Sequence, residues 1–169
     1  VGVKKRAIVN VFAIGMYTAP NVKDELIIVS FDKDKQKALS TLQNEARIVP
    51  TTFLLRYVLK PSAESIATTL GDAAQARLDM EDDEATTAVA MLKEILVESI
   101  ETKGGTATKG TIIRLDCNGE DGVTVSLDGA EQGIVPSAAL SKGLCDAFLG
   151  DKSFCPQLRE NCLQTWCAP

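Results

Sequence analysis

The feature that most constrains the fold is a pair of alternating apolar segments in the last third of the chain. Residues 111–117 and 123–127 place Thr, Ile, Leu, Val and Cys side chains at every second position. This is the period of a β-strand with one buried face. The segment 118–122 and the Asp128-Gly129 dipeptide supply turns, and a short strand is expected around residues 133–135. The pattern predicts an antiparallel sheet with one apolar face.

Four segments have the apolar spacing of amphipathic helices. They are expected to start after Ser62, at the acidic run Glu81-Asp82-Asp83-Glu84, after Ser137 and at Pro156. Ser62 and Ser137 can accept a hydrogen bond from the first helical turn. The acidic run resembles a cation site, but carboxylates are favoured at a helix N-terminus, and we prefer this structural interpretation to a metal site. The last of these helices is expected to run through Trp166.

The first third of the chain is less regular. A long strand is expected over Val3–Tyr17, a second strand or an extended crossing segment over Leu26–Phe31, a surface helix over Lys33–Asn44, and a strand over Thr51–Leu59. The order of strands, helices, strands and helices predicts an α+β fold, in which helices cover one face of an antiparallel β-sheet. With 169 residues, a single domain over residues 1–169 is expected.

Composition excludes several function classes. The chain contains no histidine, so it has no Ser-His or Cys-His pair, no imidazole base and no imidazole metal ligand. The net charge of −5 argues against nucleic-acid binding, which usually needs clustered basic residues. The dense basic run Lys4-Lys5-Arg6 is interpreted as the solvated start of a strand. No apolar run approaches the roughly 18 residues needed to span a bilayer. We predict no cofactor and no metal.

The cysteines show no zinc or redox motif. There are five, Cys117, Cys145, Cys155, Cys162 and Cys167, and no CxxC pair. On the expected last helix, Cys155 and Cys162 lie about 10 Å apart along the axis, beyond the roughly 7 Å that a disulfide can bridge. We expect buried free thiols, with Cys167 able to pair with something distant.

Several ordered motifs resemble the chalcone isomerase fold family. They are Gly2-Val3-Lys4-Lys5, Val11-Phe12-Ala13-Ile14-Gly15-Met16-Tyr17, Ser62-Ala63-Glu64, Leu127-Asp128-Gly129, Gly133-Ile134-Val135, Ala139-Leu140 and Ala147-Phe148-Leu149-Gly150. The resemblance covers the chain from Gly2 to about Leu163. It implies an open-faced sandwich of sheet and helices with a cleft between them. The family's opening strands would lie before Val1, which suggests an incomplete or processed N-terminus.

The resemblance implies that the family's polar cleft groups are almost all replaced. The arginine that holds an anionic ligand falls at about Lys4, and the cleft threonine falls at Phe12. The tyrosine and asparagine of the cleft helix fall at Ser65 and Asp72, and a later threonine falls at Ala147. Catalysis of chalcone cyclisation needs donors preorganised around the developing negative charge. We therefore expect a protein that is not an enzyme of this type.

Two functions from different classes remain. The first is an accessory or structural subunit of a larger organellar complex, photosynthetic or respiratory, peripheral to the membrane. The second is a module that binds a fatty acid or another lipophilic molecule in the cleft, which Phe12, Ala147 and Phe148 would make more apolar. An alternative is that the cleft is filled, with Phe12 and Phe148 as core residues. New chemistry from Asp72, Ser65 and Lys4 is the weakest possibility. The resemblance implies a plastid, or else a mitochondrion, after removal of a transit peptide.

Overall fold

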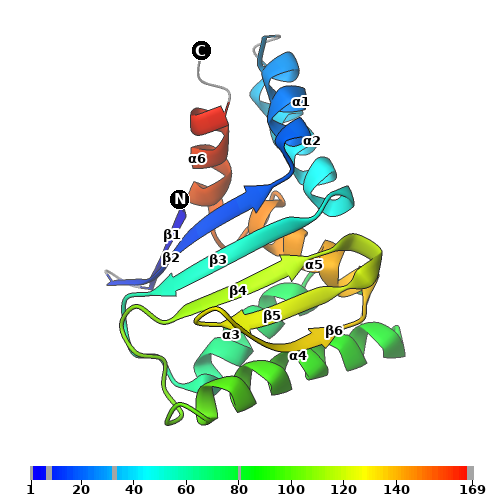
Figure 1. Ribbon diagram of the computed structural model, residues 1–169. Coiled ribbons are helices and arrows are strands. Elements are labelled where there is room, and N and C mark those ends of the chain that lie inside the picture. Colours follow the sequence, from blue (N-terminus) through cyan, green and yellow to red (C-terminus); the bar gives the residue numbers. More distant parts are fainter. Residues whose placement is uncertain (1, 7–8, 32–33, 80, 167–169) are drawn as a thin grey trace.

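Over the residues that the structure describes, the protein folds into a six-stranded antiparallel sheet and six α-helices (Figure 1). The computed structural model describes the backbone of residues 2–6, 9–31, 34–79 and 81–166, and the side chains of residues 11–26, 34–79 and 81–166. The strands are β1 (Gly2–Arg6), β2 (Val9–Thr18), β3 (Thr51–Tyr57), β4 (Ile112–Cys117), β5 (Val123–Leu127) and β6 (Ala130–Val135). Each strand pairs with the next in the chain, so the sheet is a meander.

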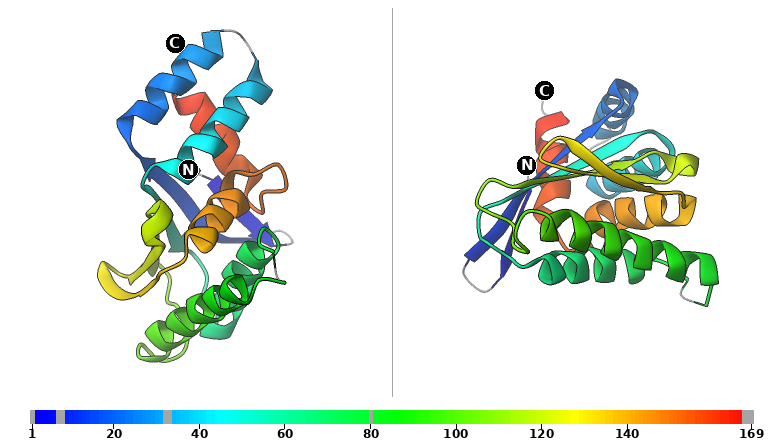
Figure 2. Two further views of the ribbon diagram at one scale, coloured as in Figure 1. Left: turned by 90° about the vertical axis from the view of Figure 1, so that its right-hand side faces the viewer. Right: turned by 60° about the horizontal axis from the view of Figure 1, so that its bottom comes forward.

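The helices cover one face of this sheet and continue beyond one end of it. They are α1 (Pro20–Phe31), α2 (Lys35–Ile48), α3 (Ala63–Gln75), α4 (Asp83–Glu101), α5 (Ala138–Leu149) and α6 (Pro156–Trp166), and one short 3₁₀ turn covers Gly119–Asp121. The right-hand view of Figure 2 shows α3, α4 and α5 together below the sheet. Helices α1 and α2 project beyond the ends of β2 and β3, where they pack on each other and on α5 and α6 (Figure 1).

Burial alternates along the strands as the sequence predicts. In β3, Phe53, Leu55 and Tyr57 are buried, whereas Arg56 between them is exposed. The buried residues of β2, β4 and β5 continue the same face of the sheet: Phe12, Ile14, Met16, Ile113, Leu115, Cys117, Val123, Val125 and Leu127. The core therefore lies between one sheet face and the helices, and the predicted α+β class is confirmed.

The helix ends follow the predicted capping. The Ser62 and Ser137 hydroxyls accept hydrogen bonds from the Ser65 and Leu140 amides, each at 3.2 Å. Asp82 caps α4 by accepting from the Glu84 amide at 3.0 Å, which confirms the structural interpretation of this acidic run. Among the described residues, no group of three or more acidic or cysteine side chains is arranged to hold a metal ion.

Two predictions for the first third of the chain were wrong. The Val3–Tyr17 segment is two strands, because β1 folds back so that Val3 pairs with Ala13. A single strand of that length would exceed the usual 3–10 residues. The Leu26–Phe31 segment is the end of helix α1, which begins at Pro20. Proline suits the first helical position, and Val22 and Leu26 are buried at helical spacing.

The described cysteines, Cys117, Cys145, Cys155 and Cys162, are buried, and no two of them form a disulfide. The prediction that Cys155 and Cys162 do not bridge is therefore confirmed. The predicted pairing freedom of Cys167 lies outside the described residues. Among the described helices, none is long and apolar enough to cross a membrane.

Gly122 sets the geometry of the turn between β4 and β5. Its φ of 88° and ψ of −142° lie in a region that is essentially restricted to glycine. A Cβ atom here would stand 2.1 Å from the Val135 carbonyl oxygen. Gly129, in the turn between β5 and β6, has a similar φ of 87°, but a Cβ there would meet nothing within 4 Å.

These two glycines give a matched test of the packing between the turn and β6. We expect Gly122→Ala to lower the free energy of unfolding by about 3 kcal/mol or more, because backbone strain and a backbone clash add. Gly129→Ala should lower the free energy of unfolding by only about 1 kcal/mol, because it introduces backbone strain but no clash. Urea denaturation of both variants measures the difference. Equal losses would contradict the close approach of Gly122 to β6.

Candidate functional site

Two aromatic rings on neighbouring strands form the floor of the candidate site. Phe12 of β2 and Tyr57 of β3 are direct cross-strand partners, and their ring centroids lie 5.5 Å apart. Both side chains point toward the helix layer and are 1% and 2% exposed, respectively. Cross-strand pairing fixes both backbones, so this floor is rigid.

A third ring comes from the loop between α5 and α6. Phe154 lies with its ring centroid 6.4 Å from that of Phe12 and 5.0 Å from that of Phe148. The Phe154 amide donates to the Ala147 carbonyl at 3.2 Å. Ser153 supports the same loop, because its hydroxyl donates to the Phe148 carbonyl at 2.6 Å and accepts from the Cys155 amide at 3.0 Å.

The opposite wall is one side of helix α3. Ser65, Thr69 and Ala73 follow each other at a spacing of four residues, lie on one stripe of the helix and are half-buried. The Thr69 hydroxyl donates to the Ser65 carbonyl at 2.7 Å. Arg77 follows the helix, and its guanidinium donates to the carbonyls of Ala73 and Lys152. Arg77 thus ties the end of α3 to the loop that carries Phe154.

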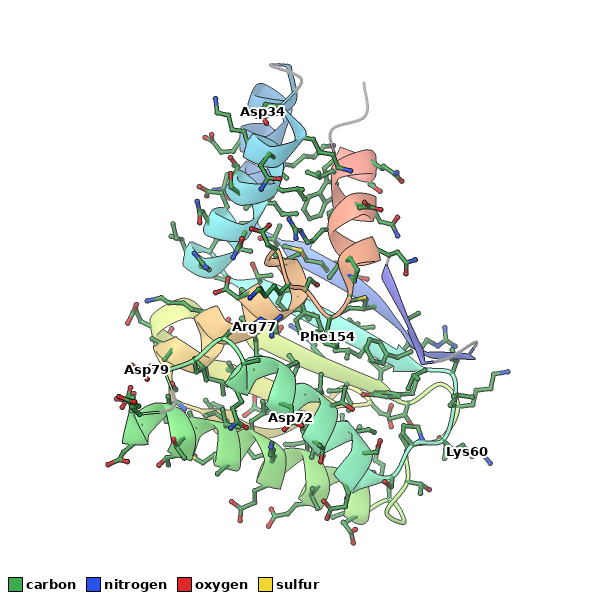
Figure 3. The ribbon with its side chains drawn as sticks, turned by 180° about the vertical axis from the view of Figure 1, so that it is seen from behind. Asp34, Lys60, Asp72, Arg77, Asp79 and Phe154 are labelled. Carbon is green, nitrogen blue, oxygen red and sulfur yellow. The ribbon has the colours of Figure 1, made fainter. Side chains whose placement is uncertain are left out.

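Between the aromatic floor and this wall lies a cleft of about 680 Å³. Its size falls in the range of pockets that bind small molecules, about 300–1,000 Å³. The lining combines rings and aliphatic side chains with hydroxyls and two carboxylates. The lining residues are Val11, Phe12, Tyr57, Pro61, Glu64, Ser65, Ile66, Thr68, Thr69, Asp72, Ala73 and Phe154. Figure 3 shows Phe154 and Asp72 on the same side of the molecule, from the loop before α6 and from α3.

Asp72 is held at the rim by an ion pair. Its carboxylate lies 2.9 Å from the Lys93 ammonium of α4. Gly71 makes this possible, because a Cβ at position 71 would stand 2.0 Å from the Lys93 Cε atom. The lysine stem therefore crosses α3 at its glycine. Asp72 and Ser65 are seven residues apart on α3, about 10 Å along the axis, so the carboxylate is too distant to serve as a base for the Ser65 hydroxyl.

The structure brings three of the predicted site residues together. Phe12, Ser65 and Asp72 line the cleft. Ala147 and Phe148 are not among the lining residues. Both are buried in α5, and the Phe148 ring stacks on Phe53 with centroids 4.3 Å apart. Both residues support Phe154 from the core: the Ala147 carbonyl accepts a hydrogen bond from the Phe154 amide, and the Phe148 ring contacts the Phe154 ring. The backbone of Lys4 pairs with Phe12, but the side chain of Lys4 lies outside the described residues.

Sequence reasoning missed Tyr57, Thr69 and Phe154. Tyr57 continues the alternation of Phe53 and Leu55. The sequence therefore indicates that its side chain points to the core face, but only the strand register places it beside Phe12. Thr69 lies one helical turn after Ser65, a signal that points to the same helix face. Phe154 stands in a loop without periodicity, and no local pattern indicates where its ring points.

Comparison with known proteins supports the fold. A comparison with family models finds no match, and a comparison with curated protein sequences finds none either. Among solved structures, the crystal structure of a fatty-acid binding protein of Arabidopsis thaliana is similar with a TM-score of 0.70. The alignment covers 99% of this chain and 86% of that chain at 18% sequence identity. The chain therefore has the chalcone isomerase fold that its sequence resembles.

Burial controls the titration of groups in and near the core. Burial raises the pKa of the Tyr57 hydroxyl well above its usual value, and burial raises the pKa of the Cys162 thiol to about 11. The pKa of the Cys117 thiol is also raised. The larger cause is its hydrogen bond with Cys145, and the second cause is burial. In each case the folded protein favours the neutral form. These groups are therefore not ionised nucleophiles near neutral pH.

The raised pKa values predict a loss of stability at alkaline pH. The folded state holds these protons more tightly than the unfolded chain, whose Cys and Tyr groups ionise near about pH 8.5 and 10. Their contribution is thus fully present below that range and is lost as pH rises through the folded pKa values. Urea denaturation between about pH 8 and 11 should show this decline.

Two tyrosine variants isolate the part of this alkaline loss of stability that comes from Tyr57 in the cleft floor. Tyr57→Phe should flatten the decline above about pH 10, because it removes the buried ionisable hydroxyl. Tyr17→Phe is the matched control, since Tyr17 is 62% exposed, and it should leave the decline unchanged. An unaltered decline in Tyr57→Phe would show that the Tyr57 hydroxyl does not titrate as a buried group.

Proposed function

We propose that this protein binds a lipophilic small molecule in the cleft between α3 and the aromatic floor. The single observation that carries the proposal is the open volume of about 680 Å³ bounded by Phe12, Tyr57 and Phe154. Apolar and aromatic surfaces of this kind favour burial of a hydrocarbon chain over water. The similar Arabidopsis structure is that of a fatty-acid binding protein, which supports a binding role for the same fold.

Non-catalytic binding fits the chemistry of the cleft. The hydroxyl and the carboxylate that the sequence suggested for new chemistry are those of Ser65 and Asp72, and the Asp72 carboxylate is already paired with Lys93. Activation of a serine needs a general base within hydrogen-bond reach, and the spacing along α3 separates these two. We therefore propose a carrier or sensor of a lipophilic ligand rather than an isomerase.

The accessory-subunit function stays a prediction from the sequence. The cleft favours a small ligand and says nothing about an organellar complex. A location in a plastid, or in a mitochondrion, is likewise proposed on the sequence resemblance alone. Native mass spectrometry of protein from its source, read for both co-purifying subunits and acyl-chain masses, separates the two functions.

A filled cleft provides the direct test of ligand binding. Thr69→Phe places a ring into the cleft from its half-buried wall and should abolish binding of a fluorescent hydrophobic probe, anilinonaphthalene sulfonate, and of unlabelled long-chain lipids that displace it. Thr86→Phe is the matched control, because Thr86 is exposed on α4 and its hydroxyl also donates to the carbonyl four residues earlier, at 3.2 Å.

The two variants should have similar stabilities, but only Thr86→Phe should still bind the probe. Each adds the same ring and removes the same type of helix back-bond, so a difference in probe binding reports the cleft alone. Equal probe binding by both variants would contradict the proposed function. Thermal unfolding, measured alongside, verifies that Thr69→Phe is folded.

A further inference from the structure

The hydroxyl of Tyr57 is a polar group in the otherwise apolar floor of the cleft. The Tyr57 amide donates to the Thr111 carbonyl at 2.9 Å, and the Tyr57 carbonyl accepts from the Gly110 amide at 2.8 Å. These bonds fix the backbone from which the ring projects. Tyr57 is 2% exposed, whereas the other described polar lining residues are half-buried or exposed, namely Glu64, Ser65, Thr68, Thr69 and Asp72.

This buried hydroxyl has no partner within the described protein. Among the residues that the structure describes, none forms a hydrogen bond with it, and burial is the cause of its raised pKa. The hydroxyl is not sealed in the core, because the described side-chain atom that is enclosed without a partner is Nε of Arg159. The open volume that Tyr57 lines is the cleft. The hydroxyl therefore opens into the cleft with its proton unused.

The hydroxyls on the helix wall are in a different position. The Thr69 hydroxyl already donates to the Ser65 carbonyl at 2.7 Å. Ser65 is half-buried and Thr68 is exposed, so water reaches both from the rim. A ligand that covers the aromatic floor removes water from Tyr57 instead. Loss of that water costs free energy unless the ligand itself accepts the hydrogen bond.

We infer that the Tyr57 hydroxyl donates a hydrogen bond to the bound ligand, and that the cleft selects a lipophile with an acceptor oxygen over a hydrocarbon of the same shape. The inference rests on the proposed function, since it names a polar contact made by the ligand of the same cleft. The acceptor oxygen lies at the floor beside Tyr57, and the apolar part of the ligand covers the rings of Phe12 and Phe154.

A matched pair of ligands tests the inference. One is methyl hexyl ketone, and the other is the alkene in which a methylene group replaces its oxygen. Both are uncharged and nearly equal in shape, and only the ketone accepts a hydrogen bond. Their affinities are measured by displacement of anilinonaphthalene sulfonate from the intact protein.

Tyr57→Phe removes the hydroxyl and keeps the ring. We expect it to weaken binding of the ketone about threefold to tenfold, the range for one neutral hydrogen bond, and to leave the affinity for the alkene unchanged. Tyr17→Phe is the matched control, because Tyr17 is exposed on β2, and it should change neither affinity.

Infrared spectra of the bound ketone give a second readout. A hydrogen bond from Tyr57 lowers the stretching frequency of the ligand carbonyl, and Tyr57→Phe should raise it again. A purely structural role of Tyr57 would change the affinities for ketone and alkene together and leave this band in place.

The outcomes distinguish the inference from the function beneath it. An unchanged ketone affinity in Tyr57→Phe, or an equal loss for the alkene, overturns the inference and leaves lipophile binding in place. A ketone affinity that falls in Ser65→Ala and not in Tyr57→Phe overturns it as well, and assigns the hydrogen bond to the helix wall. Binding of neither ligand overturns the proposed function itself.

Discussion

A continuous row of aromatic contacts connects the sheet to the helix layer, and the cleft depends on it. The row runs from Tyr57 through Phe12, Phe154 and Phe148 to Phe53, with successive centroids 5.5, 6.4, 5.0 and 4.3 Å apart. It joins β2 and β3 to α5 and the loop that follows α5, which lie far from these strands in the sequence. Each ring contributes large apolar area and a preferred geometry, so the row holds the floor of the cleft in place.

The cleft stays open because the side chains opposite this row are short. Ser65, Thr69 and Ala73 face Phe12, Tyr57 and Phe154 across the cleft. The sequence resemblance implies that a tyrosine occupies the position of Ser65 in related isomerases, and a serine there lacks the ring and carries its hydroxyl on a shorter side chain. The short side chains on this wall leave room for a lipophilic ligand against the aromatic floor.

The sequence predicted the architecture best where local and tertiary preferences agree. The alternation in β4 and β5 and the caps at Ser62 and Ser137 specify their elements locally, and the structure contains them. The Leu26–Phe31 run was misassigned because a short apolar run fits a buried helix and a strand equally well. Phe12, Ser65 and Asp72 were placed in the cleft by resemblance, whereas Phe154 depends on a loop held by Ser153 and the Ala147 carbonyl, contacts that no local pattern reveals.

We expect the apolar chain of a ligand to lie against the aromatic floor of this cleft. A crystal structure of the protein with a long-chain alcohol that carries bromine at its far end tests this most directly, because anomalous scattering locates the bromine without bias from the protein coordinates. We expect a single strong anomalous peak beside Phe12, Tyr57 and Phe154. A peak on the uncovered face of the sheet, or an empty cleft in crystals saturated with the alcohol, would contradict it.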